Sequence, residues 1–154
     1  MHEGKRILII EDDQEISMLL SVIVAKAKME PVAAYSGTEG LLQLRNTAFD
    51  LILLDLMLPG KSGEELIKEI RETISVPIIV ISALSDIKNK VQVLKMGADD
   101  YITKPFHPEE VTARMEVQLR KADVFPKQRA QTGWRKLTVN TEKRSVSLNG
   151  RELQ

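Results

Sequence analysis

Polar side chains suited to an active or binding site close strand-length segments at four places in the sequence. These residues are Glu11, Asp12, Asp55, Ser82 and Lys104. Apolar runs of four to eight residues, such as 51–54, are typical of strands buried on both faces of a parallel sheet. A carboxylate at the end of such a strand is costly to desolvate unless a cation or hydrogen-bond donors contact it. Open α/β sheets bind ligands at the carboxyl ends of their strands, so we expect these side chains to form one site.

Three carboxylates at one sheet edge suit a divalent cation. Glu11, Asp12 and Asp55 would repel one another, which raises a carboxyl pKa unless a cation lies among them. Oxygen ligands in a partly open site favour Mg²⁺, with Mn²⁺ as the alternative ion. A cation beside Asp55 would make that residue a suitable nucleophile toward phosphorus, because it neutralises charge on the incoming phosphoryl group. Lys104 and Ser82 would then contact phosphoryl oxygens.

Composition excludes several classes of protein. The 154 residues are 43% hydrophobic and 29% charged, which is an ordinary balance for one α/β domain and little more. The absence of cysteine excludes disulfides, thiolate metal sites and cysteine nucleophiles, and it fits a reducing cytosol. The apolar runs are only strand-length, and residues 1–6 lack the core of a signal peptide. We therefore expect a cytoplasmic protein with no membrane span.

The net charge of zero conceals two parts of opposite charge. Residues 1–121 hold 15 Lys and Arg against 19 Asp and Glu, a net of −4. Residues 122–154 hold 7 against 3, a net of +4, and the two parts sum to zero. An acidic body joined to a basic C-terminal piece indicates two modules with different partners, and nucleic acid is one candidate for the basic piece.

Strands and helices are predicted to alternate five times along the chain. The predicted strands are 6–10, 31–35, 51–55, 77–82 and 100–104. Strand 31–35 is expected at an edge because Pro31 cannot donate to a central ladder. The intervening helices are predicted to begin before Ile16, at Ser36 or Thr38, at Ser62, at Ser85 or Asp86, and at Pro108. This alternation indicates βαβ units in a doubly wound five-stranded parallel sheet of order 2-1-3-4-5.

Apolar periodicity predicts which face of each helix packs on the sheet. In the first helix the predicted stripe is Ile16, Leu19, Leu20, Ile23 and Ala27. In the fourth helix it is Ile87, Val91 and Leu94. The fourth helix is predicted to stop at Gly97, and the last helix to end at about Lys121.

Residues 122–154 differ from the α/β body. Residues 122–133 lack periodicity and contain Pro126, so we interpret them as a linker. Residues 134–154 alternate as short strands, with a hairpin signal at Asn149–Gly150. Three short strands bury little apolar surface without a partner layer. We therefore expect a first domain at 1–121, and in 134–154 the beginning of a second.

Four stretches resemble the receiver domain of bacterial two-component response regulators, which has a flavodoxin-like (CheY-like) fold. They are RILIIEDDQEI, DLILLDLMLPGKSG, PIIVISAL and GADDYITKPF, spread over residues 6–106. The resemblance implies that Asp55 is the phosphoacceptor and that Glu11 and Asp12 are the acidic pair. It also implies that Mg²⁺ is bound directly by Asp12, Asp55 and the backbone carbonyl of Met57.

The same resemblance assigns the residues around the phosphoryl group. Ser82 would be the switch hydroxyl, Lys104 the phosphate-binding lysine and Tyr101 the aromatic residue that changes rotamer. The Lys104–Pro105 peptide bond is expected to be cis. Asp13 lies just beyond the acidic pair and is expected to open the first helix.

The stretches GADDYITKPFHPEE and LTVNTEKRSVSLNGRELQ resemble the OmpR/PhoB subfamily, in which a winged-helix DNA-binding domain follows the receiver. Members dimerise through charge pairs on the face formed by the fourth helix, fifth strand and fifth helix. The corresponding residues are Lys88, Lys90, Asp99, Asp100, Glu110 and Arg114. Lys95 stands where an acidic residue is usual, which puts part of that pairing in question. No DNA-reading residue is expected in this chain, because the resemblance stops before a recognition helix.

The resemblance implies a switch rather than a turnover enzyme. A sensor histidine kinase would donate its phosphoryl group to Asp55, and the population would shift toward a homodimer. Paired DNA-binding domains would then meet half-sites in promoter DNA. By family analogy Met57 and Leu84 border the path of attacking water, and both are apolar, so we expect slow self-hydrolysis.

Three other functions fit parts of the pattern. A Mg²⁺-dependent phosphatase with an aspartyl-phosphate intermediate commonly has a second Asp where Met57 lies. A flavodoxin-like FMN protein needs a Ser/Thr-rich loop, whereas the acids at 11–13 would repel its phosphate. A stand-alone receiver that acts by protein contact would differ only in the chain beyond Gln154.

His107 is expected to be a surface residue rather than a ligand, and His2 has no visible role.

Overall fold

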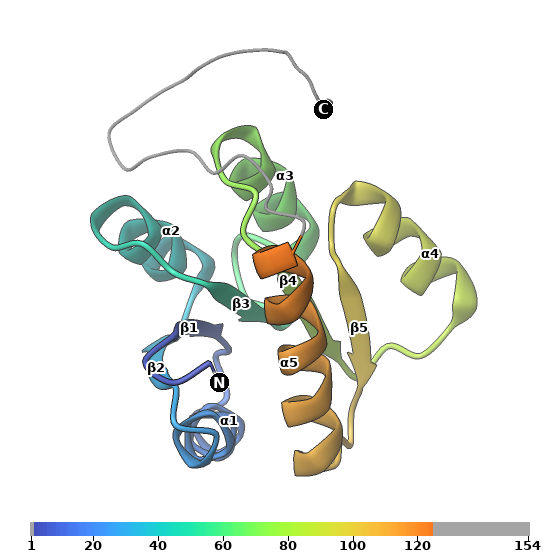
Figure 1. Cartoon of the computed structure of the whole chain (residues 1–154). Coiled ribbons are helices and arrows are strands. Elements are labelled where there is room, and N and C mark those ends of the chain that lie inside the picture. Colours follow the sequence, from blue (N-terminus) through green and yellow to red (C-terminus); the bar gives the residue numbers. More distant parts are fainter. Residues whose placement is uncertain (1, 125–154) are drawn as a thin grey trace.

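A computed structural model of the chain describes residues 2–124 as a five-stranded parallel sheet flanked by five helices (Figure 1). The strands are β1 (Arg6–Ile10), β2 (Glu30–Ala34), β3 (Leu51–Leu54), β4 (Ile78–Ser82) and β5 (Asp100–Thr103). The helices are α1 (Gln14–Lys26), α2 (Gly37–Asn46), α3 (Gly63–Thr73), α4 (Ile87–Met96) and α5 (Pro108–Val124). The strand order is β2-β1-β3-β4-β5, which confirms the predicted doubly wound fold and the edge position of β2.

Alternating residues of the central strands supply two hydrophobic layers, one on each face of the sheet. Leu8, Ile52 and Val80 pack on the side of α2, α3 and α4. Ile9 and Leu53 pack on the opposite side, with α1 and α5. Because both faces are covered, β1, β3 and β4 are almost wholly apolar (Figure 1).

Short polar side chains begin four of the helices. Asp13, Ser36, Ser62 and Asp86 each accept a hydrogen bond from a backbone N–H three residues later. Such caps satisfy N–H groups that have no partner within the helix. At α3 the Glu65 side chain also accepts from the Ser62 N–H, which completes a capping box. Two of the predicted alternatives are thereby decided, in favour of Ser36 and Asp86.

The predicted inward faces of two helices are partly wrong. In α1, Leu19 is 45% exposed, and Val24 is fully buried instead. In α4, Ile87, Val91 and Leu94 are all exposed, and Val93 is the residue that faces the core. Both helices carry more apolar residues than one face holds, so the periodicity fits two orientations of the helix. The position of the helix on the sheet decides which of these residues face the core.

Helix α5 extends to Val124, so residues 122–124, predicted to begin a linker, are helical. The rest of the predicted linker and the strands predicted in 134–154 lie outside the described residues. Within residues 2–124, no helix is both long and apolar enough to cross a bilayer. His2, which had no predicted role, is buried, and its Nε2 lies 3.1 Å from Asp123 Oδ2 at the end of α5.

Candidate functional site

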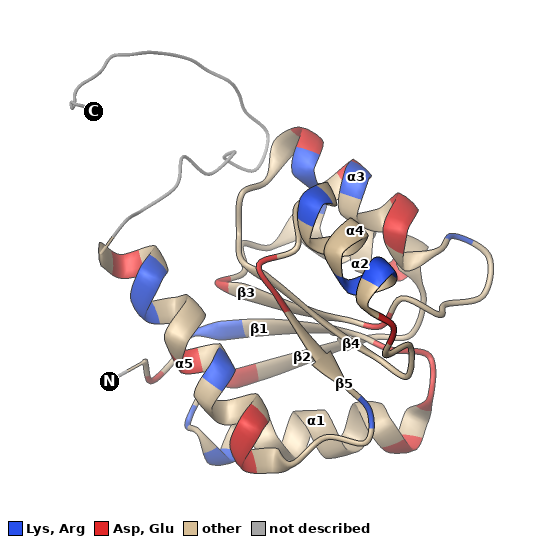
Figure 2. Ribbon diagram, turned by 90° about the vertical axis from the view of Figure 1, so that its right-hand side faces the viewer, with Lys and Arg blue, Asp and Glu red and all other residues tan. Residues whose placement is uncertain are grey.

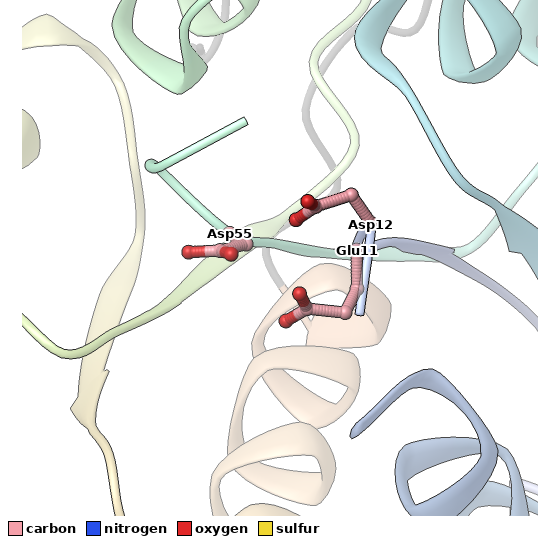
Figure 3. Close-up of side chains that lie close together, drawn as sticks. All are labelled: Glu11, Asp12 and Asp55. Carbon is pink, nitrogen blue, oxygen red and sulfur yellow. The ribbon is translucent and has the colours of Figure 1, made fainter. Parts of the chain in front are cut away.

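The carboxyl ends of β1 and β3 bring three acids together. The two strands are neighbours in register, with Ile10 opposite Leu54, so the next residues, Glu11 and Asp55, leave the sheet side by side. The Asp55 N–H donates to the Ile10 carbonyl at 3.0 Å and extends the ladder by one residue. Figure 3 shows Glu11, Asp12 and Asp55 converging, and one carboxylate oxygen from each lies within 4.8 Å of the other two. The predicted convergence of these three acids is confirmed.

The three acids differ in their access to solvent. Glu11 and Asp55 are 2% and 6% exposed, whereas Asp12 lies at the surface. Backbone N–H groups contact the two buried acids: Asp13 donates to Glu11 Oε2 at 3.1 Å, and Met57 donates to Asp55 Oδ1 at 3.2 Å. The site is therefore open on the side of Asp12 and closed beneath Glu11 and Asp55.

Lys104 places one ammonium group among these carboxylates. Its Nζ lies 3.0 Å from Glu11 Oε1 and 3.4 Å from Asp55 Oδ2. The Lys104 backbone N–H donates to the Ser82 carbonyl at 2.8 Å, which fixes the end of β5 against the end of β4. The Lys104–Pro105 bond is cis, as expected. We refer to Glu11, Asp12, Asp55 and Lys104 as the acid cluster.

Burial and charge shift the titration of two members of the acid cluster. Burial raises the pKa of the Glu11 carboxyl and nearby Asp55 adds to the rise, against the opposing effects of the Asp13 N–H and Lys104. Burial works against the charged form of Lys104, but the hydrogen bond to Glu11 and the charge of Asp55 outweigh it and raise its pKa. Three carboxylates against one ammonium leave an excess of negative charge.

The donor set of the acid cluster fits a hard divalent cation. All three acids offer oxygen, the ligand type that Mg²⁺ prefers, and the exposed side at Asp12 leaves room for the waters that Mg²⁺ retains. The acid cluster therefore has the oxygen donors that a Mg²⁺ site needs.

Ser82 and Tyr101 lie next to the acid cluster along β4 and β5. Ser82 is fully buried, and its Oγ accepts from the Leu84 N–H at 3.2 Å. The Tyr101 ring is 8% exposed, and its hydroxyl donates to the Leu84 carbonyl at 2.6 Å. Burial raises the pKa of Tyr101, an effect that the Ser82 side chain opposes. In this structure the ring thus already occupies a buried position.

Several of the residues predicted for a dimer face make contacts within the chain. Arg114 pairs with Asp100 and with Glu110, each at 3.1 Å. Lys90 Nζ lies 5.6 Å from the centroid of the Tyr101 ring. Lys88 and Lys95 are exposed on α4, and both charge signs occur along α5 (Figure 2).

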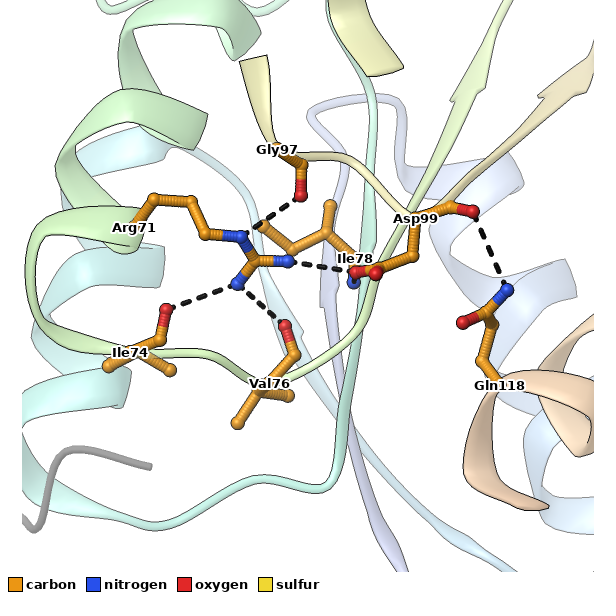
Figure 4. Close-up of polar contacts among 7 residues, drawn as sticks. All are labelled: Arg71, Ile74, Val76, Ile78, Gly97, Asp99 and Gln118. Carbon is orange, nitrogen blue, oxygen red and sulfur yellow. Dashed lines mark hydrogen bonds and ion pairs between the residues drawn. The ribbon is translucent and has the colours of Figure 1, made fainter. Parts of the chain in front are cut away.

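Asp99, one of the residues predicted for a dimer face, belongs to a polar cluster just before the start of β5 (Figure 4). Its Oδ2 accepts from Arg71 Nη2 at 2.8 Å and from the Ile78 N–H at 2.9 Å. The Arg71 guanidinium also donates to the carbonyls of Gly97, Ile74 and Val76 at 2.9, 3.1 and 2.8 Å. Gln118 of α5 reaches the Asp99 carbonyl at 3.5 Å. We call Arg71, Asp99 and these carbonyls the Arg71 cluster.

Sequence reasoning missed Arg71 because its main partners are distant in the chain. A basic residue in the last turn of a helix is common, since it interacts favourably with the helix dipole. Gly97 and Asp99 follow Arg71 by 26 and 28 residues, so no local pattern connects them. The one signal in the sequence is Gly97 itself, which predicts only the end of a helix.

Comparison with known proteins agrees with the geometry. Residues 7–116 match the family described as the response regulator receiver domain. YrkP of Bacillus subtilis, described as an uncharacterized transcriptional regulatory protein, is 41% identical over 126 residues, covering 82% of this chain and 54% of YrkP. ArlR, a response regulator of Staphylococcus aureus, is 38% identical over 149 residues, covering 97% of this chain and 66% of ArlR. The DNA-binding response regulator MtrA of Mycobacterium tuberculosis is 34% identical over 149 residues, covering 97% of this chain and 64% of MtrA.

Solved structures give the same result. The BeF3-activated N-terminal receiver domain of Klebsiella pneumoniae RstA superposes with a TM-score of 0.72 at 34% identity, covering 75% of this chain and 99% of that one. A Francisella response regulator receiver domain superposes with a TM-score of 0.74 at 31% identity, covering 77% of this chain and 99% of that one. The chain spans from about half to two thirds of the curated relatives' length, and MtrA and ArlR are OmpR/PhoB-type regulators. This chain belongs to the response regulator receiver family.

Proposed function

We propose that this chain is a phosphorylation-activated switch whose phosphoacceptor is Asp55 and whose donor is the phosphohistidine of a sensor histidine kinase. The observation that carries the proposal is the acid cluster: three carboxylates from two adjacent strands, with the Lys104 ammonium 3.0 Å from Glu11 and 3.4 Å from Asp55. A buried excess of negative charge is costly unless a cation offsets it, and a cation bound there would also attract the oxygens of an incoming phosphoryl group.

Mg²⁺ would be held by carboxylate oxygens of Asp12 and Asp55 and the Met57 carbonyl, with Glu11 beside them. When bound, it supplies positive charge that offsets the negative charge of the carboxylates and of the phosphoryl oxygens. Mn²⁺ has the same ligand preference and could replace it.

The chain's own residues would perform the transfer. An Asp55 carboxylate oxygen attacks phosphorus, the phosphorus–nitrogen bond of the donor breaks, and the imidazole leaves with the electron pair. Lys104, which contacts Asp55 Oδ2, would stay beside the phosphoryl oxygens and stabilise their charge. The Ser82 hydroxyl would donate a hydrogen bond to another phosphoryl oxygen, and Tyr101 would be held in its buried position beside Ser82.

The output would be a homodimer formed through α4, β5 and α5, with DNA contacted by a second domain. This proposal is supported by the apolar surface of α4 and by relatives named as DNA-binding response regulators. Turnover is not part of the proposed function, since the chain would undergo phosphotransfer and slow self-dephosphorylation only.

Slow loss of the phosphoryl group is proposed because Met57 and Leu84 offer no polar group to orient an attacking water. Met57 is 59% exposed beside Asp55, so its side chain can be changed without opening the core. We expect purified acylphosphate to persist for minutes or longer, and Met57→Asn to shorten its lifetime. Loss within seconds in the original chain, or an unchanged lifetime in Met57→Asn, would refute this part of the proposal.

The central test is labelling by acetyl phosphate with and without Mg²⁺. We expect stoichiometric acylphosphate on the original chain only with Mg²⁺, and none on Asp55→Ala. Asp123→Ala, which removes a half-exposed aspartate far from the acid cluster, is the matched control and should label normally. Intact-protein mass spectrometry measures the added phosphoryl group. Equal labelling of Asp55→Ala and the control would exclude Asp55 as the acceptor.

A further inference from the structure

The last turn of α5 has little of its own to keep it helical. Leu119 is the last residue that α5 buries, so residues 120–124 bury no side chain, and four of these five residues are exposed. Asp123 also places a negative charge at the C-terminal end of the helix, where the helix dipole is itself negative. An end of this kind is expected to fray, and the sequence alone predicts that α5 ends at about Lys121. Contacts from outside the helix must therefore hold this turn.

The start of the chain supplies those contacts. Residues 2–5, which we call the N-terminal segment, lie at the same end of the sheet as the end of α5 (Figure 2). The His2 side chain is only 6% exposed, and its Nε2 lies 3.1 Å from Asp123 Oδ2. Because a carboxylate can only accept a hydrogen bond, the imidazole N–H is the donor. Lys5 Nζ lies 3.8 Å from Asp123 Oδ1, so both oxygens of this carboxylate have a partner in the N-terminal segment.

The N-terminal segment is itself fixed to the sheet. The Gly4 N–H donates to the Lys28 carbonyl at 3.0 Å, and the Lys5 N–H lies 3.3 Å from its acceptor, the His2 carbonyl. The φ of Gly4 is +81°, a conformation that side chains rarely adopt, so the segment turns at this residue. The Glu30 N–H donates to the Lys5 carbonyl at 2.8 Å, which joins the segment to the start of β2. His2 and Lys5 are therefore held by the body of the protein and can support the end of a helix.

We propose that the N-terminal segment is a clasp that keeps the last turn of α5 helical by binding Asp123, and that opening of this clasp lets the turn unwind back to Leu119. His2 and Lys5 are then positioning residues for the end of α5. This accounts for the helical state of residues 122–124, which the sequence predicts as the beginning of a linker. The inference does not depend on the proposed phosphoacceptor.

Opening the clasp would lengthen the connection between α5 and the chain that follows it. A residue advances about 1.5 Å along a helix axis and about 3.3 Å in an extended chain. Unwinding residues 120–124 would therefore add roughly 9 Å of reach, since each residue gains about 1.8 Å. The clasp would thus set how far the second domain proposed above can move from the sheet.

Hydrogen–deuterium exchange of the 154-residue chain tests the proposal. In the original chain we expect amides 121–124 to be protected at least about tenfold relative to an unstructured peptide. His2→Ala should accelerate their exchange at least about threefold and leave amides 111–115, earlier in α5, unchanged. His2→Gln keeps an N–H donor and should accelerate exchange less. In a chain that already carries Asp123→Ala, His2→Ala should have no further effect, because the two residues act through one contact.

Glu3→Ala is the matched control, because Glu3 is an exposed residue of the same segment, and it should leave exchange at 121–124 unchanged. Lys5→Met removes the ammonium group beside the other carboxylate oxygen and should also accelerate this exchange, so the test does not depend on the folding of one variant. Exchange at the unstructured rate in the original chain would overturn the proposal. So would unchanged exchange in both His2→Ala and Lys5→Met, or an undiminished effect of His2→Ala in the chain that carries Asp123→Ala.

Discussion

Largely buried charges lie at both ends of the strands of the sheet, but the balance of positive and negative charge differs between the two ends. The acid cluster at the carboxyl ends of the strands has three carboxylates and one ammonium group. The Arg71 cluster, at the opposite end of the strands, has one guanidinium, one carboxylate and three backbone carbonyls. The first is unbalanced and open to solvent at Asp12, whereas the second is balanced and shielded.

This difference separates the site proposed to accept a phosphoryl group from a structural one. Burial lowers the pKa of the Arg71 guanidinium, but Asp99 opposes that effect, and the carbonyls satisfy its planar donors. In the acid cluster burial raises the pKa of Glu11, and the single Lys104 does not cancel the repulsion. The Arg71 cluster is complete without a ligand, and the acid cluster is not.

The largest expected effect is on stability at the Arg71 cluster. Arg71→Ala leaves Asp99 and several carbonyls without their cation, and we expect the free energy of unfolding to fall by about 3 kcal/mol. Arg45→Ala, on the exposed end of α2, should change it by less than about 0.5 kcal/mol. Urea unfolding followed by circular dichroism measures both. A loss no larger than in the control would mean that the Arg71 cluster is not structural.

The next effect is on cation binding at the acid cluster. Asp12→Asn removes the one acid that faces solvent, and we expect the Mg²⁺ dissociation constant to rise at least about tenfold, or about 1.4 kcal/mol. Isothermal titration calorimetry measures the affinity directly. Glu15→Gln, an exposed acid in the first turn of α1, is the control for general loss of negative charge. Equal weakening in both variants would point to nonspecific screening rather than to a site.

A third substitution should raise the free energy of unfolding, whereas Arg71→Ala lowers it. Glu11→Gln removes one of three repelling carboxylates, so without Mg²⁺ we expect the free energy of unfolding to rise by about 1 kcal/mol. The gain should grow as pH rises through the carboxyl range, because an acid whose pKa is raised by folding costs stability once it ionises. Urea unfolding at several pH values without Mg²⁺ measures it. A loss of stability at neutral pH would show that the acid cluster is already balanced.

The smallest effect concerns Tyr101, whose hydroxyl donates to the Leu84 carbonyl in the segment before α4. In Tyr35→Phe the remaining tyrosine absorbance reports on Tyr101 alone, and we expect its titration midpoint to lie above the ordinary value of about 10. Because folding favours the protonated phenol, the free energy of unfolding should fall as pH rises above that value. A midpoint at or below about 10 would contradict the burial that raises this pKa.

Much of the site could be predicted because its residues are local to strand ends. An apolar run followed by an acid identifies both the strand and the residue that leaves it, as at Leu51–Asp55. The order of the strands followed from the alternation of strands and helices. Together these place Glu11 and Asp55 side by side, as the structure does.

The helices were less predictable because their apolar residues exceed what one face can bury. Ile87, Val91 and Leu94 have a regular helical spacing, but they face solvent in the structure. Val93 faces the core because of where β5 and α3 lie, and this is not encoded in the ten residues of α4. A periodic pattern fixes the relation between residues on a helix, and only the surrounding elements fix its rotation.

The sequence by itself determined the alternation of strands and helices, the five polar residues at the strand ends and the chemistry those residue types favour, since each depends on neighbours a few positions away. The tertiary structure decided how far apart the carboxylates lie, which face of α4 is exposed, and that Arg71 holds Gly97 and Asp99. Those features depend on contacts between residues tens of positions apart, and such contacts exist only once the sheet and helices have packed together.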